Sequence, residues 1–120
     1  MVFERLAGED FAYLTTTGRR TGRPHTIEIW FAIENGRLYF LSGGRDRADW
    51  VRNIRHSAAV RVRVGSRTIA ARARVVEPDA EEDGRARQLL DAKYMGWREG
   101  KRLSSWARQS LPVAVDLPRA

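Results

Sequence analysis

Four segments of the chain alternate apolar and polar residues with a period of two, and this pattern constrains the fold more than any other feature. Isoleucine or phenylalanine occupies every second position from 27 to 33, and valine does so from 60 to 64. The same alternation returns at 69–75 and at 113–117. Because successive side chains of a strand point to opposite faces, each segment predicts a strand with one buried face. The chain is therefore predicted to be mainly β.

Turn signals between these segments predict how the strands are connected. Asn35-Gly36 is typical of a two-residue hairpin, which makes neighbouring strands antiparallel. The period changes to a helical one in the segment that contains Trp50, Val51 and Ile54, and a second helix is expected from Pro78 to about residue 93. The predicted architecture is a closed or split β-barrel of about six antiparallel strands with small helices. The expected strands are 11–17, 27–33, 38–41, 60–64, 69–75 and 112–117.

Composition predicts one globular domain over residues 1–120 with an affinity for anions. The formal net charge is +7, and Arg supplies 20 of the 22 basic residues. Arginine donates hydrogen bonds in pairs to phosphate and carboxylate groups. Cysteine is absent, and there is no signal-peptide pattern and no apolar run of membrane-spanning length, so we expect a cytoplasmic protein. No metal site is expected, because His25 and His56 lack a second ligand at a suitable spacing.

The densest positive charge lies in one predicted turn. Arg19, Arg20 and Arg23 lie within five residues and are accompanied by Gly18 and Gly22. Glycine permits backbone shapes that other residues resist, and guanidinium groups together with backbone amides can hold a phosphate. A solvated hairpin tip is the plainer interpretation. Insertion of the turn into a DNA minor groove is a further alternative.

A second glycine loop lies where the strand at 38–41 ends. It reads Ser42-Gly43-Gly44 and leads into a predicted helix that carries Arg45 and Arg47. A strand, glycines and the N-terminus of a helix together form an anion site through exposed amides. Asp46 favours the alternative of an ordinary capped helix, because its carboxylate would occupy those amides. Two such loops could hold one polyanionic ligand.

Several aromatic residues fit either a ligand wall or the protein core. Trp30 falls on the polar side of its strand, and Trp50 lies at the start of the helix after the second loop. Tyr94 and Trp97 flank Gly96 in a less regular region. The chain offers anion-binding loops and aromatic walls without an obvious catalytic side chain. This combination is typical of an enzyme whose cofactor carries the chemistry.

Three stretches together resemble a known enzyme family. They are "LTTTGRRTGRPHTIEIWF", "LSGGRDRADWVRNI" and "VRVRVGSRTIAARARVV", and the similarity runs from about residue 13 to residue 76. They resemble the deazaflavin-dependent nitroreductases and quinone reductases. Members of this family use coenzyme F420 on a split β-barrel related to the pyridoxamine oxidase barrels that bind flavin. The resemblance therefore implies the same fold and the same cofactor here.

The resemblance also implies a position for the coenzyme. In the family the basic turn binds the phosphate and the acidic tail of the coenzyme, which assigns that role to Arg19 and Arg20. Family members often have a lysine after the serine of the second loop, whereas this chain has Gly43, so Arg45 or Arg47 is expected to replace that charge. The other residues that the resemblance places against the coenzyme are Gly22, Arg23, Pro24, Trp30, Ser42, Gly43, Gly44, Trp50 and Asn53.

The implied reaction is hydride transfer from the reduced coenzyme to a small electrophilic acceptor such as a quinone, an activated alkene or a nitroaromatic compound. Tyr94 is the predicted proton donor, and Tyr94 with Trp97 is expected to line the acceptor pocket. The alternatives are an oxidoreductase that binds FMN on the same barrel, a carrier of F420 without turnover, and a basic barrel that binds nucleic acid, which the sequence favours least. A monomer and a homodimer both remain open.

Overall fold

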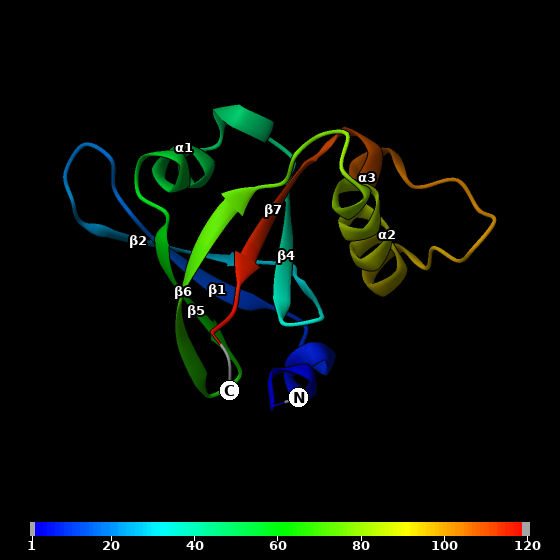
Figure 1. Ribbon diagram of the computed structural model, residues 1–120, viewed down its shortest axis with the longest axis horizontal. Coiled ribbons are helices and arrows are strands. Elements are labelled where there is room, and N and C mark those ends of the chain that lie inside the picture. Colours follow the sequence, from blue (N-terminus) through cyan, green and yellow to red (C-terminus); the bar gives the residue numbers. More distant parts are fainter. Residues whose placement is uncertain (1, 119–120) are drawn as a thin grey trace.

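Seven antiparallel strands form one curled sheet in the computed structural model, which describes residues 2–118 (Figure 1). The strand order across the sheet is β2-β1-β5-β6-β7-β4-β3. Every neighbouring pair is antiparallel. The strands are β1 (Ala12–Thr17), β2 (Pro24–Ile29), β3 (Ala32–Glu34), β4 (Arg37–Ser42), β5 (Ala59–Val64), β6 (Arg67–Val75) and β7 (Leu111–Asp116). The mainly β architecture is therefore confirmed.

The sheet curls back on itself, so that β2 and β3, which follow one another in the chain, lie at its two ends. β2 and β3 are separated in sequence by Trp30 and Phe31 alone, yet they occupy opposite ends of the strand order. The alternation predicted one strand over 27–33, and this prediction was wrong at the bend. Phe31, Ala32 and Ile33 are all buried, so the side chains stop alternating between core and solvent at that point. The bend makes one strand into two and raises the count from about six to seven.

Side chains from the concave face of the sheet form the main core. Its largest fully buried members include Leu14, Phe31 and Phe40. In β1 the buried side chains are Ala12, Leu14 and Thr16, while Phe11 at the edge of the strand is 42% exposed. A second apolar cluster lies beneath α2 and includes residues of β4 and β7. Those two strands are therefore buried on both faces, unlike β5, which alternates strictly between buried and exposed residues.

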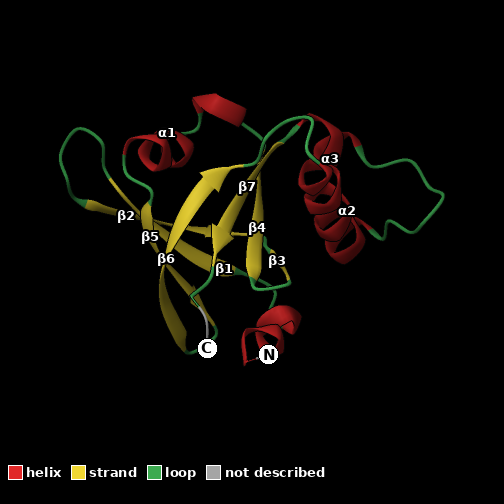
Figure 2. Ribbon diagram, viewed as in Figure 1, coloured by secondary structure: helices red, strands yellow, loops and turns green. Residues whose placement is uncertain are grey.

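Helices cover two separate parts of the sheet, with α1 toward β2 and α2 with α3 toward β4 (Figure 2). Helix α2 begins three residues after the predicted start at Pro78. Asp46 does not cap α1, because Ala48 occupies the N-cap and Asp46 pairs with Arg55 instead. Within residues 2–118, no helix combines the length and the apolar character that crossing a bilayer requires. The helices are η1 (Val2–Gly8), η2 (Arg45–Arg47), α1 (Asp49–His56), α2 (Glu81–Met95) and α3 (Ser105–Gln109).

An ionic network attaches the first turn of α2 to the sheet. Arg74 on β6 donates two hydrogen bonds to Glu82, at 2.7 and 3.0 Å, and two to Asp116, at 2.8 and 3.0 Å. The hydroxyl of Tyr39 donates to Glu82 at 2.7 Å. These bonds hold the pKa of Glu82 down at about 2, with Arg74 as the largest cause. Burial, followed by the bond to Glu82, raises the pKa of Tyr39 to about 12.

Two residues of α2 hold the short helix α3 at both of its ends. The buried carboxylate of Asp91 accepts from the backbone N–H of Ser104 at 2.8 Å and from its hydroxyl at 2.6 Å. The guanidinium of Arg87 donates to the carbonyls of Ala107, at 2.6 Å, and Ser110, at 2.8 Å. Arg87 and Asp91 are one helical turn apart, so they face the same side of α2. The loop between α2 and α3 is therefore fixed where it ends, at Ser104, and the exit from α3 is fixed at Ser110.

Candidate functional site: a basic pocket between the 18–23 turn and α1

The basic turn is a six-residue hairpin loop between Thr17 and Pro24, which are partners in the β1–β2 ladder. The Gly18 N–H donates to the Arg23 carbonyl, and the Gly22 N–H donates to the Gly18 carbonyl, each at 2.8 Å. Gly22 has a φ of +73°, a conformation that favours glycine. These backbone bonds fix the main-chain conformation from which the arginine side chains of the turn extend.

Gly18 lies against the side chains of His25 and Thr21, so a larger residue here would displace them. A Cβ at this position would lie 2.7 Å from Nε2 of His25 and 3.0 Å from Oγ1 of Thr21. Both distances are at or below the shortest that real Cβ contacts show. The imidazole of His25 therefore packs directly on the backbone at the start of the turn.

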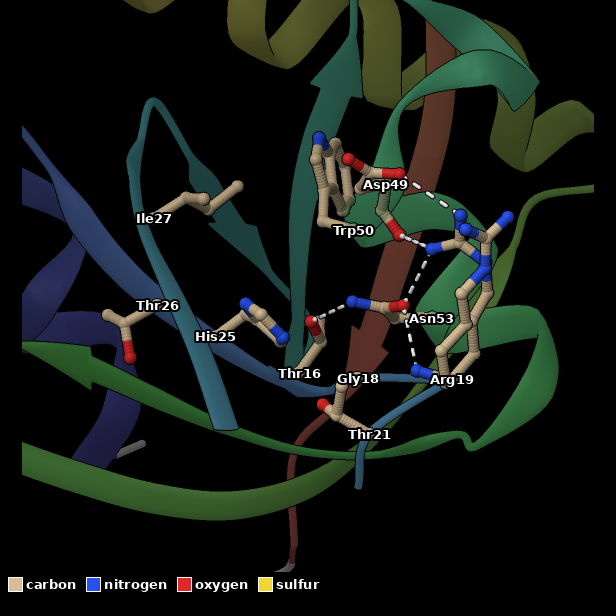
Figure 3. A pocket seen from close by; sticks show the side chains of 11 residues that line it. Thr16, Gly18, Arg19, Thr21, His25, Thr26, Ile27, Asp49, Trp50 and Asn53 are labelled. Atoms are coloured by element: carbon tan, nitrogen blue, oxygen red, sulfur yellow. Dashed lines mark hydrogen bonds and ion pairs between the residues drawn. The ribbon is translucent and has the colours of Figure 1, made fainter. Parts of the chain in front are cut away.

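Asn53 connects the turn to α1 and β1 (Figure 3). Its side chain is buried, and its Oδ1 accepts from the backbone N–H of Arg19 at 3.2 Å and from Nη1 of Arg19 at 2.9 Å. Its Nδ2 donates to the buried hydroxyl of Thr16 at 3.1 Å. Nη2 of Arg19 also pairs with Oδ1 of Asp49 at 3.1 Å. The Arg19 guanidinium is consequently held against α1 in one orientation.

A pocket of about 490 Å³ lies between this turn, β2 and α1. Arg20 lines it with an exposed side chain, and no hydrogen bond or ion pair within residues 2–118 involves that guanidinium. With Asp49 already paired to Arg19, the charged groups around the pocket leave an excess of positive charge. The lining residues are Thr16, Gly18, Arg19, Arg20, Thr21, His25, Thr26, Ile27, Asp49, Trp50 and Asn53.

The structure brings four of the predicted coenzyme residues to this pocket: Arg19, Arg20, Trp50 and Asn53. Trp50 is half-buried, and its ring meets Phe40 edge to face at 6.1 Å between centroids. Gly22 and Pro24 line a neighbouring groove of about 420 Å³, which shares Thr16 with the pocket. The turn therefore separates two hollows, and Arg19 and Arg20 line the one on the α1 side.

The second glycine loop lies before α1 and outside the residues that line the pocket. The buried hydroxyl of Ser42 donates to the Arg45 carbonyl at 3.0 Å. Arg45 has a φ of +53°, and its guanidinium donates to the Gln109 carbonyl at 2.7 Å, which directs it toward α3. Gly43 and Arg47 are exposed, and a Cβ at Gly43 would meet no atom within 4 Å. The backbone at Gly43 is thus open to a ligand, whereas the charge of Arg45 is already engaged.

The predicted aromatic wall lies at the other helical region, against α2 and α3. Trp30 stacks face to face on Tyr94, with centroids 4.3 Å apart and planes 1° from parallel, and meets Trp106 edge to face at 5.4 Å. The Tyr94 hydroxyl donates to the Asp10 carbonyl at 2.8 Å and accepts from the Phe31 N–H at 3.0 Å. Burial raises the pKa of Tyr94. Neither Trp30 nor Tyr94 lines the basic pocket.

Trp97 and Arg23 lie apart from the pocket as well. The Trp97 indole donates to the Lys101 carbonyl at 2.7 Å, which closes the first part of the loop after α2. Arg23 is exposed on the turn, and its backbone N–H donates to the Thr21 hydroxyl at 3.2 Å. The roles predicted for these two residues stay predictions.

Sequence reasoning missed several residues that line the pocket. His25 and Thr16 are partners in the β1–β2 ladder, so the hairpin register alone places them beside the turn. That register could have been found by pairing the two strands outward from the loop. Asp49 offered no comparable signal, because its contact with Arg19 depends on how α1 packs. Among the residues that the structure describes, no three His, Asp or Glu side chains come together as a metal site would require.

Solved structures share this fold at low sequence identity. A conserved hypothetical protein from Mycobacterium tuberculosis is similar with a TM-score of 0.80 and 17% identity, over 98% of this chain and 79% of that one. A putative pyridoxamine 5'-phosphate oxidase from Listeria innocua gives 0.71 and 16%, over 98% and 91%. An F420-H2 dependent reductase gives 0.68 and 23%, over 88% and 93%. These similarities identify the curled sheet as a split barrel of the pyridoxamine oxidase type.

A family model provides the comparison that goes beyond the fold. It describes the F420H(2)-dependent quinone reductases and matches residues 1–118, which covers every element and the whole basic pocket. The match agrees with the resemblance carried by the basic turn and the second glycine loop. The chain belongs to the F420H(2)-dependent quinone reductase family.

Proposed function

We propose that this protein binds coenzyme F420 with its anionic portion in the basic pocket and passes a hydride to a small electrophilic acceptor. The observation that carries the proposal is the unpaired guanidinium of Arg20 in a pocket whose other arginine is already fixed in place. A charged donor that lines a pocket and is not engaged by another described residue suits a phosphate or carboxylate. Membership of the family supports F420 as the source of that anion.

The donor set of the pocket fits such a group. Arg20 offers its full guanidinium, and Arg19 adds positive charge from a position fixed by Asn53 and Asp49. The Thr21 hydroxyl and the His25 ring add polar atoms on the turn side. Because Arg19 is already oriented, little side-chain freedom has to be lost when an anion binds.

The bound coenzyme would supply the hydride, and the residues of the chain would supply orientation. Arg19 and Arg20 would anchor the anionic portion, with Trp50 as an apolar wall of the same pocket. The open backbone at Gly43 would admit the remainder of the molecule along the second loop. Holding a reactant at a fixed place is the main contribution that such a site makes to the rate. Quinones, activated alkenes and nitroaromatic compounds are the proposed acceptor classes.

The proton that accompanies the hydride is assigned to Tyr94 in this proposal, with Tyr94 and Trp97 on the acceptor side. The geometry limits how Tyr94 could act. Its hydroxyl already donates to the Asp10 carbonyl, so it could give up a proton only if that bond opened. The raised pKa keeps the phenol protonated at neutral pH.

Titration of the purified protein with oxidised F420 and, separately, with FMN tests the cofactor assignment. We expect micromolar or tighter binding of F420 and much weaker binding of FMN. Removal of both Arg19 and Arg20 should raise the dissociation constant for F420 at least tenfold, about 1.4 kcal/mol. Arg20→Ala alone should weaken F420 binding without changing stability, because its guanidinium makes no hydrogen bond or ion pair with a described residue. Arg72→Ala is the matched control, since this exposed arginine lies on β6 away from the pocket.

Each contrary outcome has a specific meaning. Unchanged F420 affinity in the Arg19→Ala/Arg20→Ala variant would mean that the basic pocket does not bind the coenzyme. Tight FMN binding would keep the fold and make the protein a flavin-dependent oxidoreductase. F420 binding without turnover of any acceptor class would indicate a carrier. If neither cofactor binds and oligonucleotides bind with a steep salt dependence, the nucleic-acid alternative is correct.

A further inference from the structure

The imidazole of His25 on β2 is a further titratable group in the lining of the basic pocket. His25 is the cross-strand partner of Thr16, so both side chains lie on the same face of the hairpin. Ile27 and Ile29 continue this face along β2 and pack against the main core. At the end of the strand nearest the turn, the same stripe carries an exposed imidazole instead of an isoleucine. The register therefore places a polar ring where the strand borders the pocket.

The ring of His25 is not engaged by the rest of the fold. Figure 3 shows it on the β2 wall of the pocket, directed toward Gly18 and Thr16. Its Nε2 lies against the turn, since a Cβ on Gly18 would be only 2.7 Å from this atom. Within residues 2–118, no hydrogen bond or ion pair involves either nitrogen of the ring. Both nitrogens are therefore available to a ligand.

The charged groups that face His25 come from the turn and from α1. Arg19 and Arg20 line the pocket from the turn, and the exposed Arg23 lies two residues before His25. Asp49 on α1 is the one acid among the lining residues, and its carboxylate pairs with Arg19 at 3.1 Å. β1 adds no charged group to the lining. A protonated imidazole would add to the positive charge of this pocket, and a bound anion would offset it.

A bound anion favours the protonated form of a neighbouring imidazole. The neutral ring donates from one nitrogen and presents a lone pair at the other, whereas the protonated ring donates from both. An opposite charge within a few ångströms stabilises the charged form of a titratable group, and hydrogen bonds from a charged donor to phosphate or carboxylate are stronger than neutral ones. Histidine ordinarily changes its charge between about pH 5 and pH 8. Anion binding near neutral pH can therefore bring a proton onto the ring.

We propose that His25 is a third anion-binding group of the basic pocket and that it takes up a proton when the anion binds. The inference rests on the proposed function only in taking F420 as the source of the anion. The protonated ring contributes affinity at low pH, and this contribution is lost as pH rises through the range in which imidazole titrates. Arg19 and Arg20 keep their charge throughout this range, so His25 is the lining residue that supplies the pH dependence.

Fluorescence titrations with F420 from about pH 5.5 to about pH 8 measure this contribution in the wild-type protein and in His25→Gln. The dissociation constant of the variant should be about tenfold above that of wild type at the acid end, and the two should converge at the alkaline end. Any titration of the coenzyme itself affects both proteins equally and cancels in this ratio. His56→Gln is the matched control and should follow wild type, because His56 is the other histidine of the chain and lies exposed at the end of α1.

NMR of the imidazole rings follows the proton directly and needs no turnover. The chain contains two histidines, so the signals of His25 and His56 can be followed separately. Sulfate serves as a second probe, because its charge does not change in this pH range. Saturation with sulfate or F420 should move the pH midpoint of the His25 signals upward and leave that of His56 in place.

The outcomes distinguish this inference from the proposed function. If F420 binds at no pH, the proposed function is wrong, and the sulfate titration still tests His25. If F420 binds but the ratio of dissociation constants is the same at every pH, or the His25 midpoint does not move, the proton uptake is wrong while the pocket assignment stands. An equal movement of the His56 midpoint would indicate a general charge effect and would also overturn the inference. Thermal melts of both variants exclude loss of folding as the cause.

Discussion

Arg19 and Arg20 are adjacent in sequence, but their surroundings give them different tasks. Arg19 is bonded through its backbone and its side chain to Asn53 and through its side chain to Asp49. Arg20 lines the pocket, and its guanidinium has no hydrogen-bond or ion-pair partner among the described residues. A pair of arginines in a turn therefore does not act as two equal ligands. Loss of Arg19 should disturb the turn itself, whereas loss of Arg20 should remove one charge and nothing else.

Tyr94 allows a test that separates a structural role from a catalytic one. Tyr94→Phe keeps the ring that stacks on Trp30 but leaves the Phe31 N–H without its acceptor. We expect the free energy of unfolding to fall by about 1–2 kcal/mol in urea denaturation, because a partly buried donor loses its partner. If Tyr94 also donates the proton, kcat should fall much more than a smaller fraction of folded protein would explain. The dissociation constant for F420 should stay the same.

If the Tyr94→Phe variant, measured where it is fully folded, has the kcat of the wild type, then Tyr94 has a structural role only. Tyr13→Phe is the matched control. Its hydroxyl donates to Glu28 at 2.8 Å in a solvent-exposed bond, and its half-buried ring lies on the outer face of β1. Its loss should change neither stability nor kcat appreciably.

At the scale of elements, α2 organises the half of the molecule that lies away from the basic pocket. Its first turn is fixed to β6 and β7 through Glu82, its middle holds α3 through Arg87 and Asp91, and its last turn carries Tyr94. A helix with contacts on so many sides is stabilised by tertiary interactions more than by its intrinsic propensity. Changes in these contacts should therefore be measurable as changes in global stability.

Glu82 should make the stability of the protein depend on acid pH. Its pKa is about 2 in the folded protein against 4.5 for the ordinary group, so the folded state favours the ionised form. The resulting stabilisation is fully present above about pH 4.5 and is lost as pH falls toward 2. Glu82→Gln should lower the free energy of unfolding at pH 7 by about 2 kcal/mol, and the difference from wild type should shrink steadily below pH 4.5.

Denaturant titrations between pH 2 and pH 7 measure this difference directly. Glu81→Gln is the control, because it removes the same charge from the same helix turn, at an exposed position, without breaking a described hydrogen bond. A difference between Glu82→Gln and wild type that stays constant across this range would contradict the assignment.

The strands that could be predicted from the sequence are those with one buried face. β5 alternates Val60, Val62 and Val64 with exposed partners, so its boundaries followed from the pattern. The bend at Trp30 could not be predicted, because Phe31 and Ile33 continue the alternation of β2 while Ala32 becomes buried from the opposite face by packing beneath α2. Burial from two sides is a property of the whole fold and leaves no periodic signal.

The candidate site shows the same division between local and long-range information. Gly18, Gly22 and the three arginines of the turn are close in sequence, so their cluster was visible at once. The contact of Arg19 with Asn53 joins residues 34 positions apart, and the two side chains meet because α1 packs against β1. Local chemistry could predict an anion site, but which arginine remains free to bind depended on that packing.

At the scale of the whole molecule, the net charge of +7 should attract an anionic coenzyme before contact is made. We expect the dissociation constant for F420 to rise several-fold between low and high NaCl concentration, because salt screens this attraction. Fluorescence titrations at a series of salt concentrations measure the slope. Arg20→Ala should give a shallower slope than Arg72→Ala, which removes the same net charge at a distance from the pocket.

Equal slopes in those two variants would mean that overall charge, rather than the pocket, determines the salt effect. Sodium sulfate at matched ionic strength provides a further comparison. The divalent anion should compete for the pocket in the wild-type protein, and this extra effect should be smaller in Arg20→Ala.

The attachment of α3 at both ends has a consequence for how such a protein can diverge over generations. The Trp97 N–H donates to the Asp91 carbonyl where the 96–104 segment leaves α2, and the Asp91 carboxylate binds Ser104 where the segment rejoins the body. Insertions and deletions between those points therefore leave the barrel untouched. Closing a longer loop costs little additional free energy, since that cost grows slowly with length. Natural selection can therefore vary this segment freely, and descendants of one ancestor can acquire new molecular preferences while inheriting an unaltered scaffold.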